Sequence, residues 1–238
     1  MVKSRIGKIT MAVLAPAMAL GATVGLASAP ASAAVWNSRD RWASTSRDGY
    51  RLYNNIWGSG AGSQCIWANS GTSWGVWADH PNTGGIKSYA DSTKTINKSI
   101  DTLSWLTSDY NVSVPSSGAY NTSYDIWDSA HQYEIMLWVN HTGSVGPIGS
   151  WQANVTLGGH NWDVYKGTNG SNQVFSFVRT SNSDSGTVDV KPVLNWIAYT
   201  RGWMPGNAVI GDVQFGYEIT SSSGGLNFNT NNLSVRGG

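Results

Sequence analysis

The sequence is poor in cysteine, glutamate and lysine. Cys65 is the only cysteine, and Glu134 and Glu218 are the only glutamates among 238 residues. A single cysteine excludes an intramolecular disulfide and a cysteine-cluster metal site. Strong helix formers are scarce, whereas Gly, Ser, Thr, Asn and aromatic residues are abundant. The composition therefore predicts an all-β protein whose stability comes from packing.

Long apolar runs are missing outside the first 33 residues. Those residues have a basic head, an apolar stretch interrupted by Pro16 and two glycines, and a small-residue end at 31–33. This pattern predicts a secretory signal peptide, residues 1–33, that is removed to leave residues 34–238 as a single domain. No later run reaches the ~18 apolar residues that span a bilayer. We therefore expect a secreted, extracellular protein.

Positive charge is not in excess either. Residues 34–238 carry 12 basic and 14 acidic side chains, a formal charge of −2. This balance excludes the basic surface typical of proteins that bind nucleic acid or anionic membranes. We expect neither partner, and we expect a monomer.

Short runs of alternating apolar and polar residues recur along the chain, separated by Gly, Asn, Ser and Pro clusters. Many short strands with turns between them predict a sandwich or jelly roll rather than βαβ units. Residues 189–200 have apolar residues at helical spacing and predict one helix that ends near Gly202. The predicted strands cover residues 50–57, 73–78, 123–127, 133–140, 161–165, 173–179, 213–220 and 226–235.

The first glutamate lies inside the alternating strand 133–140. Alternation gives this strand one apolar face, which should pack on the core: Tyr133, Ile135, Leu137 and Val139. The opposite face carries Glu134, Met136, Trp138 and Asn140. A carboxyl group that shares a face with a large aromatic ring indicates the floor of a cleft.

The second glutamate repeats this arrangement in strand 213–220. Its apolar face consists of Val213, Phe215, Tyr217 and Ile219, and the other face carries Gln214, Gly216, Glu218 and Thr220. We expect Gly216 to leave room beside Glu218 for substrate or for a neighbouring side chain. Both glutamates are thus predicted on the polar face of an otherwise apolar strand.

Two interpretations compete for these glutamates. Most strand glutamates are solvated surface residues, but a chain that uses Glu only twice, each time in an aromatic strand, is not using it as surface filler. Two facing carboxyl groups are what hydrolysis of a glycosidic bond requires, because one protonates the departing oxygen while the other attacks or activates water. The 13 tryptophans also have two possible roles, as core residues or as stacking surfaces for sugars.

Other candidate sites are weak. Asp125 alternates onto a polar face with Trp127 and is either an ordinary strand aspartate or a third carboxyl group that acts on the pair. The four histidines lack ligand spacing, and no GxSxG elbow, phosphate loop or dinucleotide fingerprint occurs. We therefore predict no metal and no cofactor.

A set of short motifs extends over most of the chain after residue 33. They are DRWA at Asp40, NNIWG at Asn54, KSY at Lys87, YDIW at Tyr124, YEIMLWVN at Tyr133, GPIGS at Gly146 and QFGYE at Gln214. With these motifs in this order, the chain resembles glycoside hydrolase family 12. The resemblance implies a concanavalin-like jelly roll of two curved antiparallel sheets, and a retaining endo-β-1,4-glucanase that acts on cellulose-type polysaccharides.

The resemblance also implies a role for each site residue. Glu134 matches the nucleophile, Glu218 the general acid/base, and Asp125 the carboxyl group that hydrogen-bonds the nucleophile. Retention implies that the two glutamates lie ~5 to 5.5 Å apart. Glu218 should be protonated at rest because Glu134 is a like charge nearby. Substrate-binding positions in the cleft match Trp42, Asn55, Trp57, Met136 and Trp138.

The chain departs from the family pattern at two places. Many members have a disulfide whose second cysteine matches Cys65, but Arg39 stands at the first position. Many have Pro after the acid/base glutamate, where this chain has Ile219. Two alternatives stay open beside the cellulase: a xyloglucan-specific endo-β-1,4-glucanase of the same fold, and a non-catalytic polysaccharide-binding jelly roll.

Overall fold

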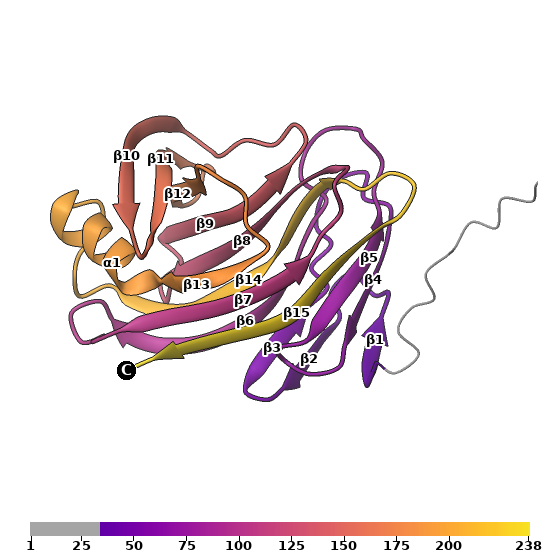
Figure 1. The fold of residues 1–238 in the computed structure, drawn as a ribbon, viewed down its shortest axis with the longest axis horizontal. Helices are drawn as coiled ribbons and strands as arrows, with labels where there is room; N and C mark the ends of the chain where they lie inside the picture. Colours follow the sequence, from indigo (N-terminus) through magenta and orange to yellow (C-terminus); the bar gives the residue numbers. More distant parts are fainter. Residues whose placement is uncertain (1–33) are drawn as a thin grey trace, which may run out of the picture. The chain divides into compact units, whose positions relative to one another are not determined.

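The structure, a computed structural model, describes residues 34–238, so the predicted signal peptide lies outside the described residues. The described chain forms two β-sheets packed face to face, with one short helix beside them (Figure 1). The predicted all-β class and jelly-roll sandwich with one helix are confirmed.

The larger sheet has nine strands in the order β10-β11-β12-β9-β8-β14-β6-β3-β2. Its neighbouring strands are antiparallel except for β12 and β9, which run parallel. In that spatial order the strands are Ser150–Leu157, His160–Thr168, Gln173–Arg179, Tyr133–Thr142, Ala119–Asp128, Val209–Ser221, Ser88–Ser99, Tyr50–Tyr53 and Ser44–Arg47.

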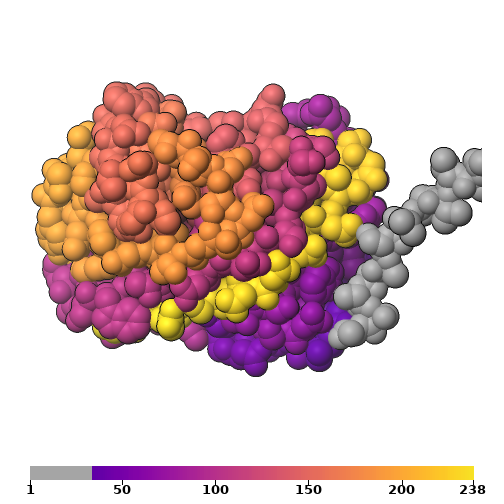
Figure 2. Space-filling view, in the orientation of Figure 1, coloured from indigo at the N-terminus to yellow at the C-terminus, as the bar shows by residue number. Residues whose placement is uncertain are grey.

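The smaller sheet has six strands in the order β1-β4-β5-β15-β7-β13. Its strands are Trp36–Ser38, Ser63–Ala68, Trp74–Asp79, Leu226–Gly237, Leu106–Ser113 and Ser185–Asp189. Figure 2 shows β15, in yellow, crossing the visible face of the molecule between β7 and the indigo N-terminal strands. All pairs in this sheet are antiparallel.

The core lies between the two sheets and is rich in aromatic rings. The predicted apolar faces of β9 and β14 point into it, because Ile135, Leu137, Val139 and the four apolar residues of strand 213–220 are fully or almost fully buried. Tyr217 of the large sheet packs against Trp74 and Phe228 of the small sheet, with ring centroids 5.4 and 5.3 Å apart. Aromatic contacts of this kind join the two sheets across the core.

The predicted helix is present, but its second half is wound differently. It begins as α1, Val190–Asn195, and continues as a π-helical turn, Trp196–Thr200. Its buried residues include those that set the helical spacing, Val190, Val193, Leu194 and Ile197. Gly202 follows with a φ of 60°, which favours glycine and ends the helix. Within residues 34–238, no helix is long and apolar enough to cross a membrane.

Several strand boundaries differ from the prediction. The strand expected over residues 50–57 ends at Tyr53, since Asn55 has a φ of 44° that a strand does not accommodate. Gly216 does not leave space beside Glu218: a Cβ there would lie 2.0 Å from the backbone oxygen of Ala90 on the next strand. The glycine therefore permits close approach of β14 and β6. Strands that the pattern missed are β1, β2, β4, β6, β7, β10 and β13.

Candidate active site

Cross-strand pairing aligns two rows of side chains across the nine-stranded sheet, on the face opposite the core. The first row runs from β6 to β10 through Thr93, Gln214, Asp125, Met136, Ser176, Tyr165 and Trp151. The second row runs alongside it from β3 to β10 through Tyr53, Asp91, Gly216, Ser123, Trp138, Val178, Asp163 and Asn154. We call these two rows the cleft floor.

The two glutamates border the cleft floor from opposite sides. Glu134 lies two residues before Met136 on β9, and Glu218 lies two residues after Gly216 on β14. Strands β9 and β14 flank β8 and both run antiparallel to it, so they run in the same direction (Figure 1). A polymer lying along the floor would therefore have one carboxyl group on each side.

A tight turn positions Glu134. Asp128 ends β8, and its carboxylate accepts the backbone N–H groups of Ala130, Gln132 and Tyr133, the last two at 2.7 Å. Aspartate is well suited to bond backbone groups a few residues ahead of it in a turn. Because Tyr133 directly precedes Glu134, this carboxylate fixes where β9 begins and where Glu134 stands on it.

Glu134 is 9% exposed and has one hydrogen-bond donor from a neighbouring loop. The Asn169 side-chain amide, between β11 and β12, donates to Oε2 of Glu134 at 3.0 Å. Burial raises the pKa of Glu134 to about 7, and the bond from Asn169 opposes this by favouring the charged form. The role of Asn169 could not be predicted from the sequence, because nothing in a turn sequence such as TNGSN indicates which strand it will contact.

Glu218 is partly buried and has a comparable amide partner. The Asn121 side chain on β8 donates to Oε1 of Glu218 at 3.2 Å. Burial raises the pKa of Glu218 to about 7, and the charge of Glu134 raises it further. From the sequence we expected the charge of Glu134 alone to raise the pKa of Glu218, whereas burial is the larger cause. Asn121 shares the polar face of β8 with Asp125, so alternation could have identified it.

Asp125 lies between the glutamates on β8, paired with Met136 on one side and Gln214 on the other. Burial raises its pKa well above the usual range, and Glu134 and Glu218 raise it further. Trp127 donates from Nε1 to Oδ2 of Asp125 at 3.0 Å, while Oδ1 is buried without a hydrogen-bond partner among residues 34–238. The three carboxyl groups interact electrostatically, which agrees with a third carboxyl acting on the pair.

A groove continues the cleft floor beyond β14. It has a volume of about 510 Å³, and its lining residues are Trp42, Tyr53, Asn55, Asp91, Thr93, His131, Asp212 and Gln214. Trp42 and Asn55, two of the predicted substrate-binding residues, thus lie in one hollow with the floor residues Tyr53 and Asp91. Trp42 is 67% exposed, which leaves its ring open to a ligand.

The other predicted binding residues have different surroundings. Met136 and Trp138 lie on the cleft floor but are only 5% and 3% exposed. The Nε1 of Trp138 is buried and has no hydrogen-bond partner among the described residues. Trp57 is exposed but does not line the groove. Trp42 and Asn55 thus line the groove, and Met136 and Trp138 lie on the cleft floor that the groove continues. Trp57 lies outside the groove.

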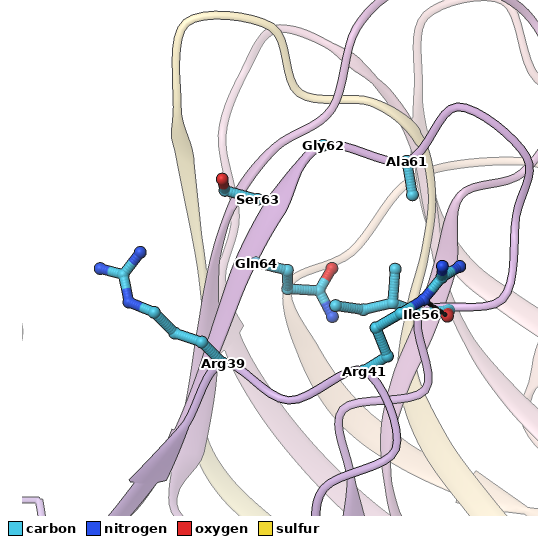
Figure 3. A pocket seen from close by; sticks show the side chains of 7 residues that line it. All are labelled: Arg39, Arg41, Ile56, Ala61, Gly62, Ser63 and Gln64. Atoms are coloured by element: carbon cyan, nitrogen blue, oxygen red, sulfur yellow. Dashed lines mark hydrogen bonds between the residues drawn. The ribbon is translucent and has the colours of Figure 1, made fainter.

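A second, smaller pocket lies where the family disulfide would be. It has a volume of about 160 Å³ and is lined by Arg39, Arg41, Ile56, Ala61, Gly62, Ser63 and Gln64 (Figure 3). Arg39 follows Ser38, the last residue of β1, whose partner on β4 is Ile66, and the half-buried Cys65 directly precedes Ile66. Its guanidinium points away from the pocket in Figure 3. None of Glu134, Glu218 and Asp125 lines this pocket.

Known proteins resemble the chain in both sequence and structure. A curated relative, the probable xyloglucan-specific endo-beta-1,4-glucanase A of Aspergillus flavus, is 34% identical over 234 residues, covering 86% of this chain and 94% of the relative. The solved xyloglucanase domain of NopAA, a type three effector from Sinorhizobium fredii in complex with cellobiose, is 42% identical with a TM-score of 0.81, covering 86% of this chain and 99% of that one.

A second solved structure agrees with these two. The family 12 xyloglucanase from Bacillus licheniformis is 28% identical with a TM-score of 0.76, and the match covers 85% of this chain and 100% of that one. The sequence profile described as Glycosyl hydrolase family 12 matches residues 48–236. With this match over most of the chain, on the fold that the described residues adopt, the chain belongs to glycosyl hydrolase family 12.

Proposed function

We propose that Glu134 and Glu218 are the catalytic carboxyl groups of this glycoside hydrolase, which is an endo-β-1,4-glucanase, and that Asp125 is the third carboxyl group of the catalytic site, where it positions Glu134. The observation that carries the assignment is the position of the two glutamates on opposite sides of the cleft floor. A glucan chain along the floor then has a carboxyl group on each side of the bond to be cut. The floor crosses the sheet from β6 to β10, which suits binding of an internal stretch of polymer.

In the first step, Glu134 acts as the nucleophile. Its carboxylate attacks the anomeric carbon as the bond to the departing oxygen breaks, and Glu218 gives its proton to that oxygen. The amide of Asn169 supports this division of roles, because it favours the charged form of Glu134. Burial, and to a lesser degree the charge on Glu134, raises the pKa of Glu218 and favours its protonated form.

In the second step, water replaces Glu134 on the sugar. Once Glu134 is esterified it carries no charge, so the pKa of Glu218 falls and Glu218 takes a proton from the incoming water. Two inversions at the anomeric carbon leave the product with its original configuration. Retention and the short separation of the two carboxyl groups stay predictions.

Asp125 orients the nucleophile. With a raised pKa it is a neutral acid, and its unpartnered Oδ1 supplies a proton for a hydrogen bond to Glu134. Such a bond holds Glu134 in place and lowers the energy of its carboxylate form. In this role Asp125 is a positioning residue that need not touch the sugar.

The main chain of the substrate is a β-1,4-glucan, and two polymers are candidates. Unbranched cellulose-type chains fit the groove beside Trp42 and the aromatic floor. Xyloglucan is favoured by the relatives, since the Aspergillus flavus protein and the NopAA domain are both described as xyloglucan enzymes. Initial rates on carboxymethylcellulose, mixed-linkage glucan and xyloglucan distinguish the two: a highest rate on xyloglucan assigns that polymer, and a higher rate on carboxymethylcellulose rejects it.

Reducing-sugar release from these polymers tests the proposed function. We expect Glu134→Gln and Glu218→Gln each to lower kcat by at least about 10²-fold, since both steps need both groups. The matched control is Asp109→Asn, which removes a surface carboxylate from β7. Wild-type protein that releases no sugar from any of the three would favour a non-catalytic sugar-binding jelly roll. Turnover that survives both Gln substitutions would refute the site.

We also propose that residues 1–33 are a signal peptide and that the mature enzyme is an extracellular monomer. The basic head, apolar stretch and small-residue end support the first part. Expression with secretion, followed by N-terminal sequencing and size-exclusion chromatography with light scattering, tests the proposal. We expect an N-terminus at Ala34 and the mass of one chain.

A further inference from the structure

An exposed tryptophan lies at the end of the cleft floor remote from the groove. Trp151 on β10 is 57% exposed, although tryptophan is usually well buried. Its partner across the strands is Tyr165 on β11, which is partly buried. Both belong to the first row of the floor, the row that contains Met136 and Asp125. That row therefore ends in two neighbouring aromatic residues.

The orientation of Trp151 depends on a β-bulge. Trp151 and Asn154 are three residues apart, so a regular strand would direct them to opposite faces. The register shifts between Trp151 and Ala153, and Trp151 and Asn154 pair with Tyr165 and Asp163, which share a face. The extra residue thus brings the indole onto the floor, as bulges do when they redirect a side chain.

Polar contacts hold the indole by its edge. Oδ1 of Asp163 accepts bonds from Nε1 of Trp151 at 3.4 Å and from the side-chain amide of Asn154 at 3.0 Å. The edge of the ring is thereby tied to the sheet while more than half of the residue stays exposed. An apolar surface with polar groups at its border matches a pyranose ring, which has an apolar face and hydroxyl groups around it.

The distance from the catalytic centre defines which part of a ligand reaches Trp151. Strand β10 is the third strand from β9, or about 14 Å along the sheet. A sugar beside the scissile bond is too far away, but the same chain continued along the floor passes over Ser176 and Tyr165 to Trp151. The occupant is therefore a more distant residue of the polymer that lies between the glutamates.

We propose that Trp151 and Tyr165 form a distal sugar-binding subsite, where Trp151 stacks on a glucosyl residue of the β-glucan chain cut at Glu134 and Glu218. This inference rests on the proposed function, because it takes the same polymer as its ligand. It adds to that function a preference for long chains, since only a long chain reaches the catalytic centre and Trp151 together.

The test compares kcat/KM on soluble cello-oligosaccharides of increasing length. We expect Trp151→Ala to lower the ratio of kcat/KM for long over short substrates by about threefold to tenfold, which corresponds to about 0.7 to 1.4 kcal/mol. Trp151→Phe should restore most of the ratio. The matched control is Trp105→Ala, which removes a 46% exposed tryptophan next to the six-stranded sheet.

Two results would overturn the subsite. Unchanged kcat/KM values of Trp151→Ala on both long and short substrates mean that no sugar stacks there, and an equal fold loss on both means that the ring acts only on the fold. If wild-type protein has no activity on any β-glucan, the proposed function fails separately. The affinity for cellohexaose, measured by calorimetry in wild type and Trp151→Ala, then decides: equal affinities reject the subsite, and a loss of affinity in the variant supports it.

Discussion

At the scale of single residues, two amide side chains lower the pKa values of the two glutamates that we propose as catalytic. Asn169 donates to Glu134, and this bond lowers the pKa of Glu134 against the effect of burial. In Asn169→Ala the pKa of Glu134 rises, so less of the nucleophile is charged at a given pH below neutrality. We expect the acidic limb of the kcat/KM profile to move to higher pH. An unmoved acidic limb would contradict the role of Asn169.

Asn121 has the corresponding effect on the other limb. Its bond to Glu218 lowers the pKa of that group, so Asn121→Ala raises it and keeps the acid protonated to higher pH. We expect the alkaline limb to move to higher pH while the acidic limb stays in place. The Asn169 and Asn121 variants are controls for each other, since a purely structural loss would lower the rate without moving one limb selectively.

The residues that the sequence could predict are those whose position follows from alternation. Glu134 and Glu218 stand out because they are the only glutamates, and their strands place them on the face opposite the core. Asn121 follows the same alternation as Asp125, so its position on the polar face of β8 could have been predicted from the sequence. The position of Asn169 could not be predicted in this way. Its contact with Glu134, 35 positions earlier, depends on the parallel pairing of β12 with β9, which brings the loop before β12 beside β9.

At the scale of elements, the close contact of β14 with β6 depends on Gly216. A Cβ at this position would lie 2.0 Å from the Ala90 backbone oxygen, so Gly216→Ala forces the strands apart next to Glu218. Overpacking of this kind costs about 1 to 3 kcal/mol, and we expect a lower Tm together with lower kcat. Gly146→Ala is the control, because nothing lies within 4 Å of a Cβ there. Equal Tm values in the two variants would contradict this account.

The elements that the pattern missed share a physical cause. Strand β6 begins with six buried residues, among them Asp91, Ser92 and Thr93, so alternation of polarity does not mark it. Its polar side chains are satisfied by local bonds, such as that from Thr93 to Asp91 at 2.6 Å and that from Ser92 to the Gly71 carbonyl at 2.6 Å. Burial of bonded polar groups is decided by tertiary partners, which the strand's own sequence does not reveal.

At the scale of the whole molecule, the buried carboxyl group of Glu218 reduces stability at neutral pH. The pKa of Glu218 is about 7 in the fold and near 4.5 when unfolded, so the folded protein binds the proton more tightly. Its contribution to the free energy of unfolding is complete below pH 4.5 and is lost as pH rises through 7. We therefore expect Glu218→Gln to be more stable than wild type by about 3 kcal/mol at pH 7.5 and by nearly nothing at pH 4.

Thermal unfolding at the two pH values measures this difference. For a protein of this size about 3 kcal/mol corresponds to a rise in Tm of roughly 6 to 12 °C. Asp109→Asn, which changes an exposed ion pair with Arg236, should show no such rise. If the Tm of Glu218→Gln equals that of wild type at pH 7.5, the buried carboxylate of Glu218 does not lower the stability of the fold.

The proposed mechanism requires that Glu134 forms a covalent bond to the sugar. The most direct measurement is mass spectrometry of peptides from enzyme treated with a 2-deoxy-2-fluoro cello-oligosaccharide that carries a good leaving group, which slows release of the glycosyl-enzyme. We expect the mass of one fluorinated oligosaccharide on the peptide that contains Glu134, and no label in Glu134→Gln. Label on Glu218, or an active enzyme that takes up no label, would contradict the account.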